Sequence, residues 1–304
     1  MRNEIIYDEK GNPDVMVTFA PDEFGLPETL KGRPVKEYCI SKYQNYVVDG
    51  TPYSMPFQVP EANVTFDKAI SLCESKGPGW HLMTNDEWAA IALWCYNHGI
   101  RPTGNISSGE DDDGGHGEKF DVRTLTGSGP NTWNHDGTSL GVADLVGNVV
   151  EFVGGVRFVN GRLQIIPDNG AAAGADQSKD SDDWQPVLTS EGKPVIYGID
   201  GNRMVITDDD NEDLDWGGDF FKDIKTKCEI PDVLKRLALY PPEGFDWKDW
   251  CWIDNDGESL VCRGGHWAIG TSAGLFYLLG LGARTNTIGG IGFRSAFVRY
   301  ADNL

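Results

Sequence analysis

A long stretch near the C-terminus that is almost free of charge constrains this chain more than any other feature. Across residues 264–293 the only charged residue is Arg284. The whole chain is 24% Asp, Glu, Lys and Arg, so thirty residues would ordinarily hold about seven charges. Such a segment belongs either to the buried core or to a neutral surface.

The periodicity of this stretch favours the surface. Residues 278–282 and 288–292 show neither the alternation of a strand nor the period of a helix. Irregular, glycine-rich loops with scattered apolar side chains are more often surface than core. We therefore predict that residues 264–292 form loops and short strands that are at least partly exposed. A glycine-rich pair of core strands is the alternative.

Composition narrows the class of protein and of partner. With 304 residues, 39% of them hydrophobic, the chain can bury a substantial core as one large domain or two smaller ones. Its 26 Lys and Arg against 47 Asp and Glu give a net charge of -21, which repels phosphate backbones and anionic membranes. No run approaches the length of a membrane span, and the first ten residues lack a signal-peptide apolar run. We expect no nucleic acid partner and no membrane insertion.

The first hundred residues predict strands followed by two helices. Short strands are expected at residues 15–19, 38–40 and 46–48, the last ending in an Asp-Gly turn at residues 49 and 50. One helix begins after Thr65 and is stopped by the Gly-Pro-Gly at residues 77–79.

The second helix opens with a capping box of Thr84 and Glu87 and ends near Gly99. Residues 101–139 are dominated by Gly, Asp, Ser, Asn and Thr, and we predict a long loop packed over the scaffold. Residues 156–250 alternate short apolar runs with acidic ones, which indicates an insertion built from hairpins.

The cysteines do not form a recognisable metal or disulfide pattern. They include no CxxC pair and no zinc-finger spacing to a histidine, and most are expected to be buried thiols. One disulfide across a hairpin, between Cys251 and Cys262, is the alternative. The six are Cys39, Cys73, Cys95, Cys228, Cys251 and Cys262.

Three acidic runs, at residues 111–113, 208–210 and 254–256, have oxygen ligands that calcium could use. None completes an EF-hand loop. Solvated turns are the better interpretation, so we predict no metal site.

Three separated stretches together resemble the formylglycine-generating enzyme, or sulfatase-modifying factor, superfamily. They read HLMTNDEW at residues 81–88, GVADLVGNVVEF at residues 141–152, and CRGGHW at residues 262–267, the last closed by GFR at residues 292–294. The resemblance implies an α+β chain with a C-type lectin fold of the formylglycine-generating subtype, with long loops and an insertion. It also implies structural roles for Asn148 and Glu151.

On this basis we divide the chain into a segment at residues 1–34 and a C-type lectin domain at residues 35–304. The domain carries an insertion at about residues 156–250 and a variable region at about residues 264–292.

The resemblance does not extend to catalysis. The catalytic members of the family carry a reactive cysteine pair just after the Arg-Gly-Gly motif, and here no cysteine follows Cys262. The five histidines also lack the His-x-x-x-His-x-Glu spacing of the related iron enzymes. We therefore predict no catalytic residue, no cofactor and no enzymatic activity. The alternatives are an enzyme or inactive relative that uses Cys251 and Cys262, and a carbohydrate-binding lectin.

A narrower resemblance accounts for the neutral C-terminus. Residues 263–294 look like the variable region of proteins diversified by diversity-generating retroelements, which copy a template with adenine-specific errors into the 3′ end of a gene. Changes at the adenines of AAC or AAT codons never produce Lys, Glu, Gln, Met or Trp. Across residues 264–294 none of the first four occurs, and Trp267 falls at a position that the resemblance makes fixed.

This resemblance implies a display protein that binds a protein or cell-surface ligand and is carried on a virion tail or a cell surface. The candidate variable, ligand-binding positions are His266, Ala268, Ile269, Thr271, Ser272, Leu279, Gly280, Leu281, Gly282, Thr285, Asn286, Thr287, Ile288, Gly289 and Gly290. The candidate scaffold positions of the site are Arg263, Gly264, Gly265, Trp267, Arg284, Phe293 and Arg294.

Overall fold

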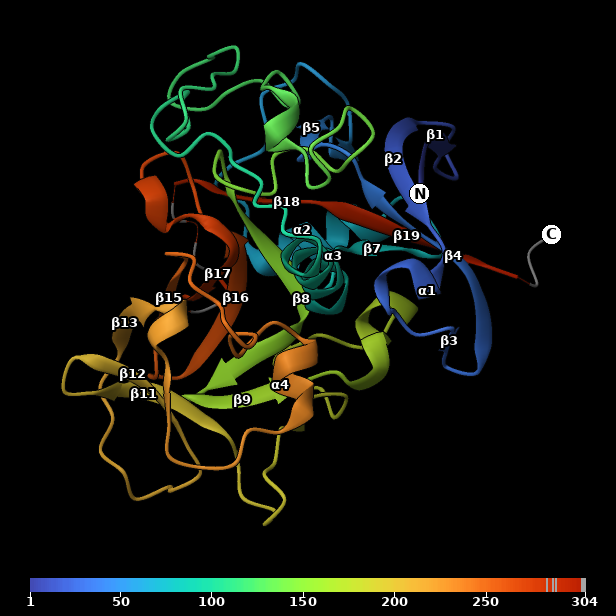
Figure 1. The fold of residues 1–304 in the computed structure, drawn as a ribbon. Helices are drawn as coiled ribbons and strands as arrows, with labels where there is room; N and C mark the ends of the chain where they lie inside the picture. The colour runs from blue at the N-terminus through green and yellow to red at the C-terminus, as the bar shows by residue number, and fades with distance from the viewer. Residues whose placement is uncertain (283, 286, 288, 302–304) are drawn as a thin grey trace.

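The chain folds as an α+β structure in which strands predominate and the helices are few (Figure 1). The computed structural model describes residues 1–282, 284, 285, 287 and 289–301. Two large sheets contain most of the strands. The first and the last strand of the chain both belong to the smaller of these sheets. No helix among these residues is both long and apolar enough to cross a membrane.

The smaller sheet joins the N-terminal strands to the last strand of the chain. Its order is β1-β2-β4-β19-β7, with β3 paired to β4. The predicted division between residues 34 and 35 falls inside β4, because the first strands pair in the same sheet as the domain they precede. The strands are β1 (Arg2–Tyr7), β2 (Pro13–Phe19), β3 (Thr29–Leu30), β4 (Arg33–Ser41), β7 (Trp80–Leu82) and β19 (Ser295–Tyr300).

The larger sheet contains both the long strand after the GVADLVGN stretch and the strands of the C-terminal segment. Its order is β13-β15-β17-β16-β8-β9-β11-β12-β14, with β10 on β9 and β18 on β8. The strands are β8 (Val150–Val159), β9 (Arg162–Ile165), β10 (Gln185–Pro186), β11 (Ile196–Asp200), β12 (Arg203–Thr207), β13 (Gly217–Phe220), β14 (Lys225–Thr226), β15 (Trp250–Ile253), β16 (Glu258–Gly264), β17 (Gly274–Gly280) and β18 (Ile291–Phe293).

The hairpins predicted for residues 156–250 are present, and they extend this sheet. β8 pairs with β9, and β11 pairs with β12, each antiparallel. Residues 156–250 therefore add strands to the larger sheet, which is continuous.

A separate hairpin confirms the turn predicted from Asp49 and Gly50. It consists of β5 (Tyr46–Val48) and β6 (Thr51–Tyr53). Asp49 and Gly50 both have positive φ, at 49° and 78°, which is the conformation that a tight two-residue hairpin turn requires.

Both predicted helices are present with their predicted caps. Thr65 Oγ1 accepts from the Lys68 amide at 3.2 Å at the start of α2. Thr84 Oγ1 accepts from the Glu87 amide at 3.2 Å, and Glu87 Oε2 accepts from the Thr84 amide at 2.9 Å, so the capping box of α3 is complete. The helices are α1 (Pro21–Phe24), α2 (Phe66–Glu74), α3 (Asn85–Asn97) and α4 (Asp232–Arg236).

Residues 101–139 form the predicted long loop, with one short 3₁₀ turn at Asn131–Trp133. Trp133 is buried, and its indole donates to Asp111 Oδ2 at 2.7 Å. Asp111 also accepts from the Gly115 amide at 2.6 Å, so the loop is ordered by its own side chains. We call this segment the long loop.

The expected buried thiols are confirmed, and the alternative of a hairpin that joins Cys251 to Cys262 is wrong, because β17 lies between β15 and β16. Cys251 pairs with Leu278, and Cys262 pairs with Leu279 on the other edge of the same strand. Both cysteines are free and buried. β17 therefore separates two strands that are close in sequence. It runs parallel to β15 and antiparallel to β16.

Candidate functional site

The neutral C-terminal segment forms two loops separated by a buried strand. We call residues 265–273 the first terminal loop and residues 281–290 the second terminal loop. Between them β17 occupies the middle of the larger sheet, where all its residues except Leu279 are buried. The prediction of an exposed segment is therefore wrong for this strand. A central strand that is covered on both faces consists of a continuous apolar run. For this reason the sequence shows no alternation of apolar and polar residues here.

The candidate positions in the two terminal loops, together with Leu279 of β17, are mostly accessible. Exposed positions are Ala268, Thr271, Thr285, Thr287 and Gly289. Half-buried positions are His266, Ile269, Ser272, Leu279, Leu281 and Gly282. Asn286 and Ile288 lie outside the described residues.

Two candidate positions are not accessible, which corrects the sequence interpretation. Gly280 is buried in β17, where an added β-carbon would come within 3.1 Å of Ile253 Cδ1. Gly290 is buried with φ of 105°, a conformation that residues with side chains rarely adopt. A ligand cannot reach either residue, and glycine is needed at residue 290 for the backbone itself.

The first terminal loop is held by main-chain hydrogen bonds to the long loop and to Asn148. The Ser108 amide donates to the Trp267 carbonyl at 2.9 Å, and the Gly270 amide donates to the Ile106 carbonyl at 3.0 Å. The Trp267 amide donates to the Asn148 carbonyl at 3.2 Å. Figure 1 shows the loop after β16 beside the green long loop. The loop is thus preorganised by backbone contacts that do not depend on its side chains.

Trp267 is only half-buried, so its truncation would cost less than the removal of a fully buried aromatic.

The start of the first terminal loop is fixed by Arg263 and two glycines. Arg263 Nε donates to Asn85 Oδ1 at 3.0 Å, and Arg263 Nη2 donates to the Ala238 carbonyl at 3.1 Å. Burial lowers the pKa of Arg263 to about 10, so it keeps its charge at neutral pH. Gly264 and Gly265 follow with φ of 89° and 79°. The Arg-Gly-Gly motif therefore ends β16 and turns the chain out of the sheet.

Arg284 holds the second terminal loop to the scaffold. Its Nε and Nη2 donate to the two oxygens of Glu258 at 2.9 and 3.0 Å, and Nη1 donates to Asp67 Oδ1 at 2.7 Å. The guanidinium also lies 5.3 Å from the ring centre of Phe66. The one charge of the segment is buried and neutralised by β16 and α2, so it does not belong to the exposed surface.

The chain after the second terminal loop is fixed by Arg294, which is 0% exposed. Its Nε and Nη2 donate to the two oxygens of Glu151 at 3.0 and 2.8 Å. Nη1 donates to the carbonyls of Ser41 and Lys42 at 2.9 and 3.0 Å. The preceding Phe293 is buried in β18. This network links both sheets beneath the terminal loops.

Asn148 and Glu151 are structural, as predicted. Asn148 has φ of 59°, and its Oδ1 accepts from the Thr124 amide at 2.9 Å while its Nδ2 donates to Gln44 Oε1 at 2.9 Å. Gln44 Nε2 in turn donates to Glu151 Oε1 at 3.0 Å. Both side chains satisfy buried polar groups under the loops.

The histidine of the segment adds no charge to the surface. His266 Nδ1 accepts from the Ala268 amide at 3.2 Å. Burial lowers the pKa of His266 below its ordinary value, so the imidazole is neutral at physiological pH. Accessible side chains of the two terminal loops are therefore small, aliphatic or neutral polar groups.

The cysteines next to the segment are poorly placed for chemistry. Burial raises the pKa of Cys251 to about 12 and raises the pKa of Cys262 further. The thiolate, which is the nucleophile and the copper ligand, is therefore disfavoured at both. Lying on opposite edges of β17, the two thiols do not form a pair.

The acidic runs serve as turn caps. Asp209 Oδ1 accepts from the Asn211 amide at 3.0 Å, and Asp254 Oδ1 accepts from the Asp256 amide at 3.1 Å. Among the described residues no three His, Cys, Asp or Glu side chains are grouped so that they could hold a metal ion.

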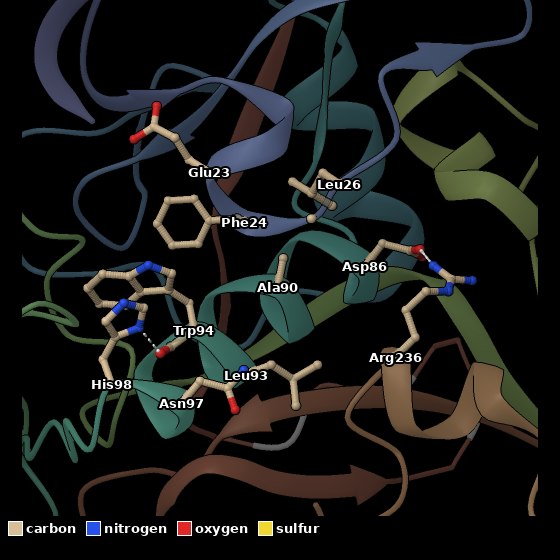
Figure 2. Close-up of a pocket in the computed structure, with 11 residues that line it drawn as sticks. Glu23, Phe24, Leu26, Asp86, Ala90, Leu93, Trp94, Asn97, His98 and Arg236 are labelled. Atoms are coloured by element: carbon tan, nitrogen blue, oxygen red, sulfur yellow. Dashed lines mark hydrogen bonds and ion pairs between the residues drawn. The ribbon is translucent and has the colours of Figure 1, made fainter.

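A pocket of about 330 Å³ that the sequence did not indicate lies between α1 and α3 (Figure 2). Asp86 and Arg236 form an ion pair of 2.8 Å at one side, and His98 stacks on Trp94 with ring centres 4.1 Å apart. Residues spaced three or four apart on the second face of α3 form the floor of this pocket. This spacing is the one sequence signal that could have revealed the pocket. No lining residue belongs to the terminal loops, and its charged groups are already paired.

Comparisons with known proteins give only distant likenesses. No family model matches the chain, and no curated protein sequence matches it. Variable protein 1 of Treponema denticola aligns with a TM-score of 0.38 and 12% identity, over 97% of this chain and 98% of that one.

The P3c and I1 variants of Major Tropism Determinant align with TM-scores of 0.32 and 0.31, at 12% and 11% identity. Each alignment covers 98% of this chain and 72% of the other. These neighbours are variable proteins of diversity-generating retroelements. A likeness this weak establishes no family, and the function rests on this chain's own residues.

Proposed function

We propose that this chain is a ligand-binding display protein with a C-type lectin fold of the formylglycine-generating subtype. Its accessible positions in the two terminal loops recognise changing protein targets. Adenine-specific mutagenic reverse transcription diversifies those positions. The protein acts without catalysis, and a virion tail or a cell surface carries it.

One observation carries this proposal: accessible positions alternate with residues that are fixed by burial. In the first terminal loop Ala268 and Thr271 are exposed, whereas the main chain around them is tied to the long loop. In the second, Thr285 and Thr287 are exposed, whereas Arg284 is buried in ion pairs. Side chains can therefore change without loss of the contacts that shape the backbone.

The chemistry of the accessible positions suits a protein target. They are uncharged in a chain of net charge -21, and several are aliphatic. An interface centre depleted in charge is typical of protein recognition. The surface lacks the tyrosines of strong paratopes, so we expect modest affinity for this version. A carbohydrate target is the third possibility, which the fold type alone suggests.

Sequencing of the gene and its surroundings tests the diversification. The proposal expects, downstream of the gene, a near-copy of its 3′ end that differs mainly at adenines, beside a reverse transcriptase gene. It also expects that a population of the source organism differs at the codons of the exposed loop positions and agrees at Arg263, Arg284 and Arg294. A uniform 3′ end with no such copy would rule out diversification.

A catalytic relative of the formylglycine-generating enzymes is the second possibility. The test incubates the protein with copper, oxygen and a cysteine-containing peptide from a sulfatase site. Because the Cys262 thiol is buried and its pKa is raised, we expect no change of mass in the peptide. A loss of about 18 Da at the peptide cysteine, abolished by Cys262→Ser, would establish catalysis instead.

A further inference from the structure

A row of partly accessible aromatic side chains lies on one face of the larger sheet, beside the second terminal loop. In β15, Trp250 and Trp252 are half-buried and alternate with the buried Cys251 and Ile253, so the two indoles share one face. Trp252 is paired with Leu279 of β17, which is the accessible residue of that strand. The aromatic row is therefore continuous with a candidate ligand-binding position.

Trp216 continues this row at the edge of the sheet. It is 60% exposed, and its ring centre lies 5.3 Å from that of Trp252, with the planes inclined at 50°. Gly217 of β13 pairs with Ile253, so the next residues along each strand, Trp216 and Asp254, lie opposite each other. Because side chains alternate along a strand, Trp252 and Asp254 share one face.

Within the described part of the chain, the Asp254 carboxylate makes one hydrogen bond, which caps a turn. Its Oδ1 accepts from the Asp256 amide at 3.1 Å. None of the ion pairs among the described residues includes Asp254. Among the described residues the other carboxylate oxygen has no hydrogen-bond or ion-pair partner, and the strand register places Asp254 next to Trp216.

The protein's own cations occupy other aromatic rings. Lys222 lies 5.8 Å from the ring centre of Phe220, which is on the same strand pair, and Arg284 lies over Phe66. Within the described part of the chain, no Lys or Arg lies over Trp216 or Trp252. Two indoles and a carboxylate are thus arranged for a cation that the chain does not supply.

We propose that Trp216, Trp252 and Asp254 bind an arginine or lysine side chain of a protein partner. Tryptophan faces attract guanidinium and ammonium groups, and an adjacent carboxylate pairs with them. In its biological role this inference rests on the proposed function: the cation site is a constant anchor beside positions that vary.

The charge of the chain favours a cationic partner over a second copy of the same chain. With 26 basic and 47 acidic residues, two copies would repel each other, and a second copy would bring the same carboxylate to the contact. A partner segment with exposed Arg or Lys gains from both the aromatic faces and the field of the whole protein.

Titration with small probes tests the site directly. The probe is N-acetyl-arginine amide, and N-acetyl-norleucine amide is the uncharged control. The readout is the tryptophan indole NMR signals of the full chain, assigned from the loss of one signal in Trp216→Ala and another in Trp252→Ala. We expect the arginine probe to shift these two signals and to leave those of the buried Trp88 and Trp133 in place.

Matched variants separate the site from general attraction. Asp254→Asn keeps an acceptor for the Asp256 amide and should weaken binding of the arginine probe by at least about threefold, as should Trp216→Ala. Asp182→Asn removes the same charge at an exposed position away from the aromatic row and should leave the affinity unchanged.

Three results would overturn the inference. The norleucine probe could shift the two indoles as strongly, Asp182→Asn could weaken binding as much as Asp254→Asn, or the shifts could follow protein concentration alone, as self-association would require. None of these results bears on the diversity of the 3′ end, so failure here is distinguishable from failure of the proposed function.

Discussion

The indole of Trp267 lies against the α-carbon of Gly290, so closely that a β-carbon at residue 290 would come within 2.9 Å of Cη2 of the ring. The contact joins the first terminal loop to the second. It also fixes the end of the second loop, where the Gly290 carbonyl accepts from the Val150 amide at 2.9 Å. The two loops are therefore joined to each other, and the scaffold holds them at Asn148 and at Val150, the first residue of β8.

Replacement of Gly290 by alanine should be costly, whereas replacement of its neighbour should not. Gly290→Ala places a β-carbon against Trp267 at a positive φ, and we expect a loss of about 1–3 kcal/mol in the free energy of unfolding. Gly289→Ala is the matched control: residue 289 is exposed, and its β-carbon would lie 3.4 Å from Asn63 Oδ1. Denaturant unfolding of both variants measures the difference, and equal losses would contradict this account of the contact.

Loss of the buried Arg294 beneath the loops should destabilise the scaffold strongly. Arg294→Met removes the guanidinium that pairs with the buried Glu151 carboxylate, and we expect a cost of about 3–5 kcal/mol in the free energy of unfolding. Arg162→Met breaks an exposed ion pair with Asp210 and should cost at most about 1 kcal/mol. Denaturant unfolding compares the two variants. Similar costs would mean that Arg294 does not hold the sheets together.

Stability should depend on pH through Asp249, a buried carboxyl next to β17. Its Oδ2 accepts from the Phe276 amide at 2.7 Å, and burial raises its pKa to about 7. Because the pKa of Asp249 is higher in the folded chain than in the unfolded one, its protonated carboxyl stabilises the folded chain fully below about pH 4. This stabilisation is lost as the pH rises through about 7. The free energy of unfolding falls by at most about 4 kcal/mol over this range.

Asp249→Asn keeps an acceptor for the Phe276 amide and removes the titrating group. We expect its free energy of unfolding to fall less between pH 5 and pH 8 than that of the parent chain. Denaturant unfolding at both pH values provides the comparison. Parallel curves for the two proteins would show that Asp249 ionises in the folded chain as freely as in the unfolded one.

Thiol reactivity should be confined to one cysteine. Cys228 is half-buried, whereas the other five are buried, and burial raises the pKa of all six thiols, so accessibility distinguishes Cys228 from the rest. A disulfide reagent that reports released thiolate should therefore find at most one reactive group in the native protein. Cys228→Ser should abolish it. Fast reaction of a second thiol would indicate that the sheet around β17 opens readily.

Local signals explain why the helices and the long loop could be predicted. Capping depends on residues three apart, such as Thr84 and Glu87, and the composition of residues 101–139 excludes regular elements without reference to the rest of the chain. Accessibility was predicted correctly for positions such as Thr271 and Thr285, because charge depletion there comes without a regular period.

Long-range pairing explains what could not be predicted. β17 is buried because β15 and β16 flank it, and the insertion of one strand between two sequence neighbours leaves no local trace. Gly280 was misjudged for this reason, whereas Gly290 is buried against Trp267 of the first terminal loop, a contact that the sequence does not show either. The alternation of Trp250 and Trp252 with the buried Cys251 in β15 comes from the structure. Its relation to Trp216 depends on the register with β13, which the sequence does not contain.

The most direct test of the display account is a pair of libraries on the cell surface of yeast. The first randomises the exposed loop positions Ala268, Thr271, Thr285 and Thr287, and the control library randomises the exposed positions Ser190, Glu191 and Lys193 of another turn. Each library is scored for resistance to protease and for enrichment against a panel of purified proteins. The account predicts that both libraries stay folded and that the first alone yields target-specific binders, whose specificity is lost when the four positions are restored. Widespread unfolding of the first library, or equal enrichment from the control library, would contradict it.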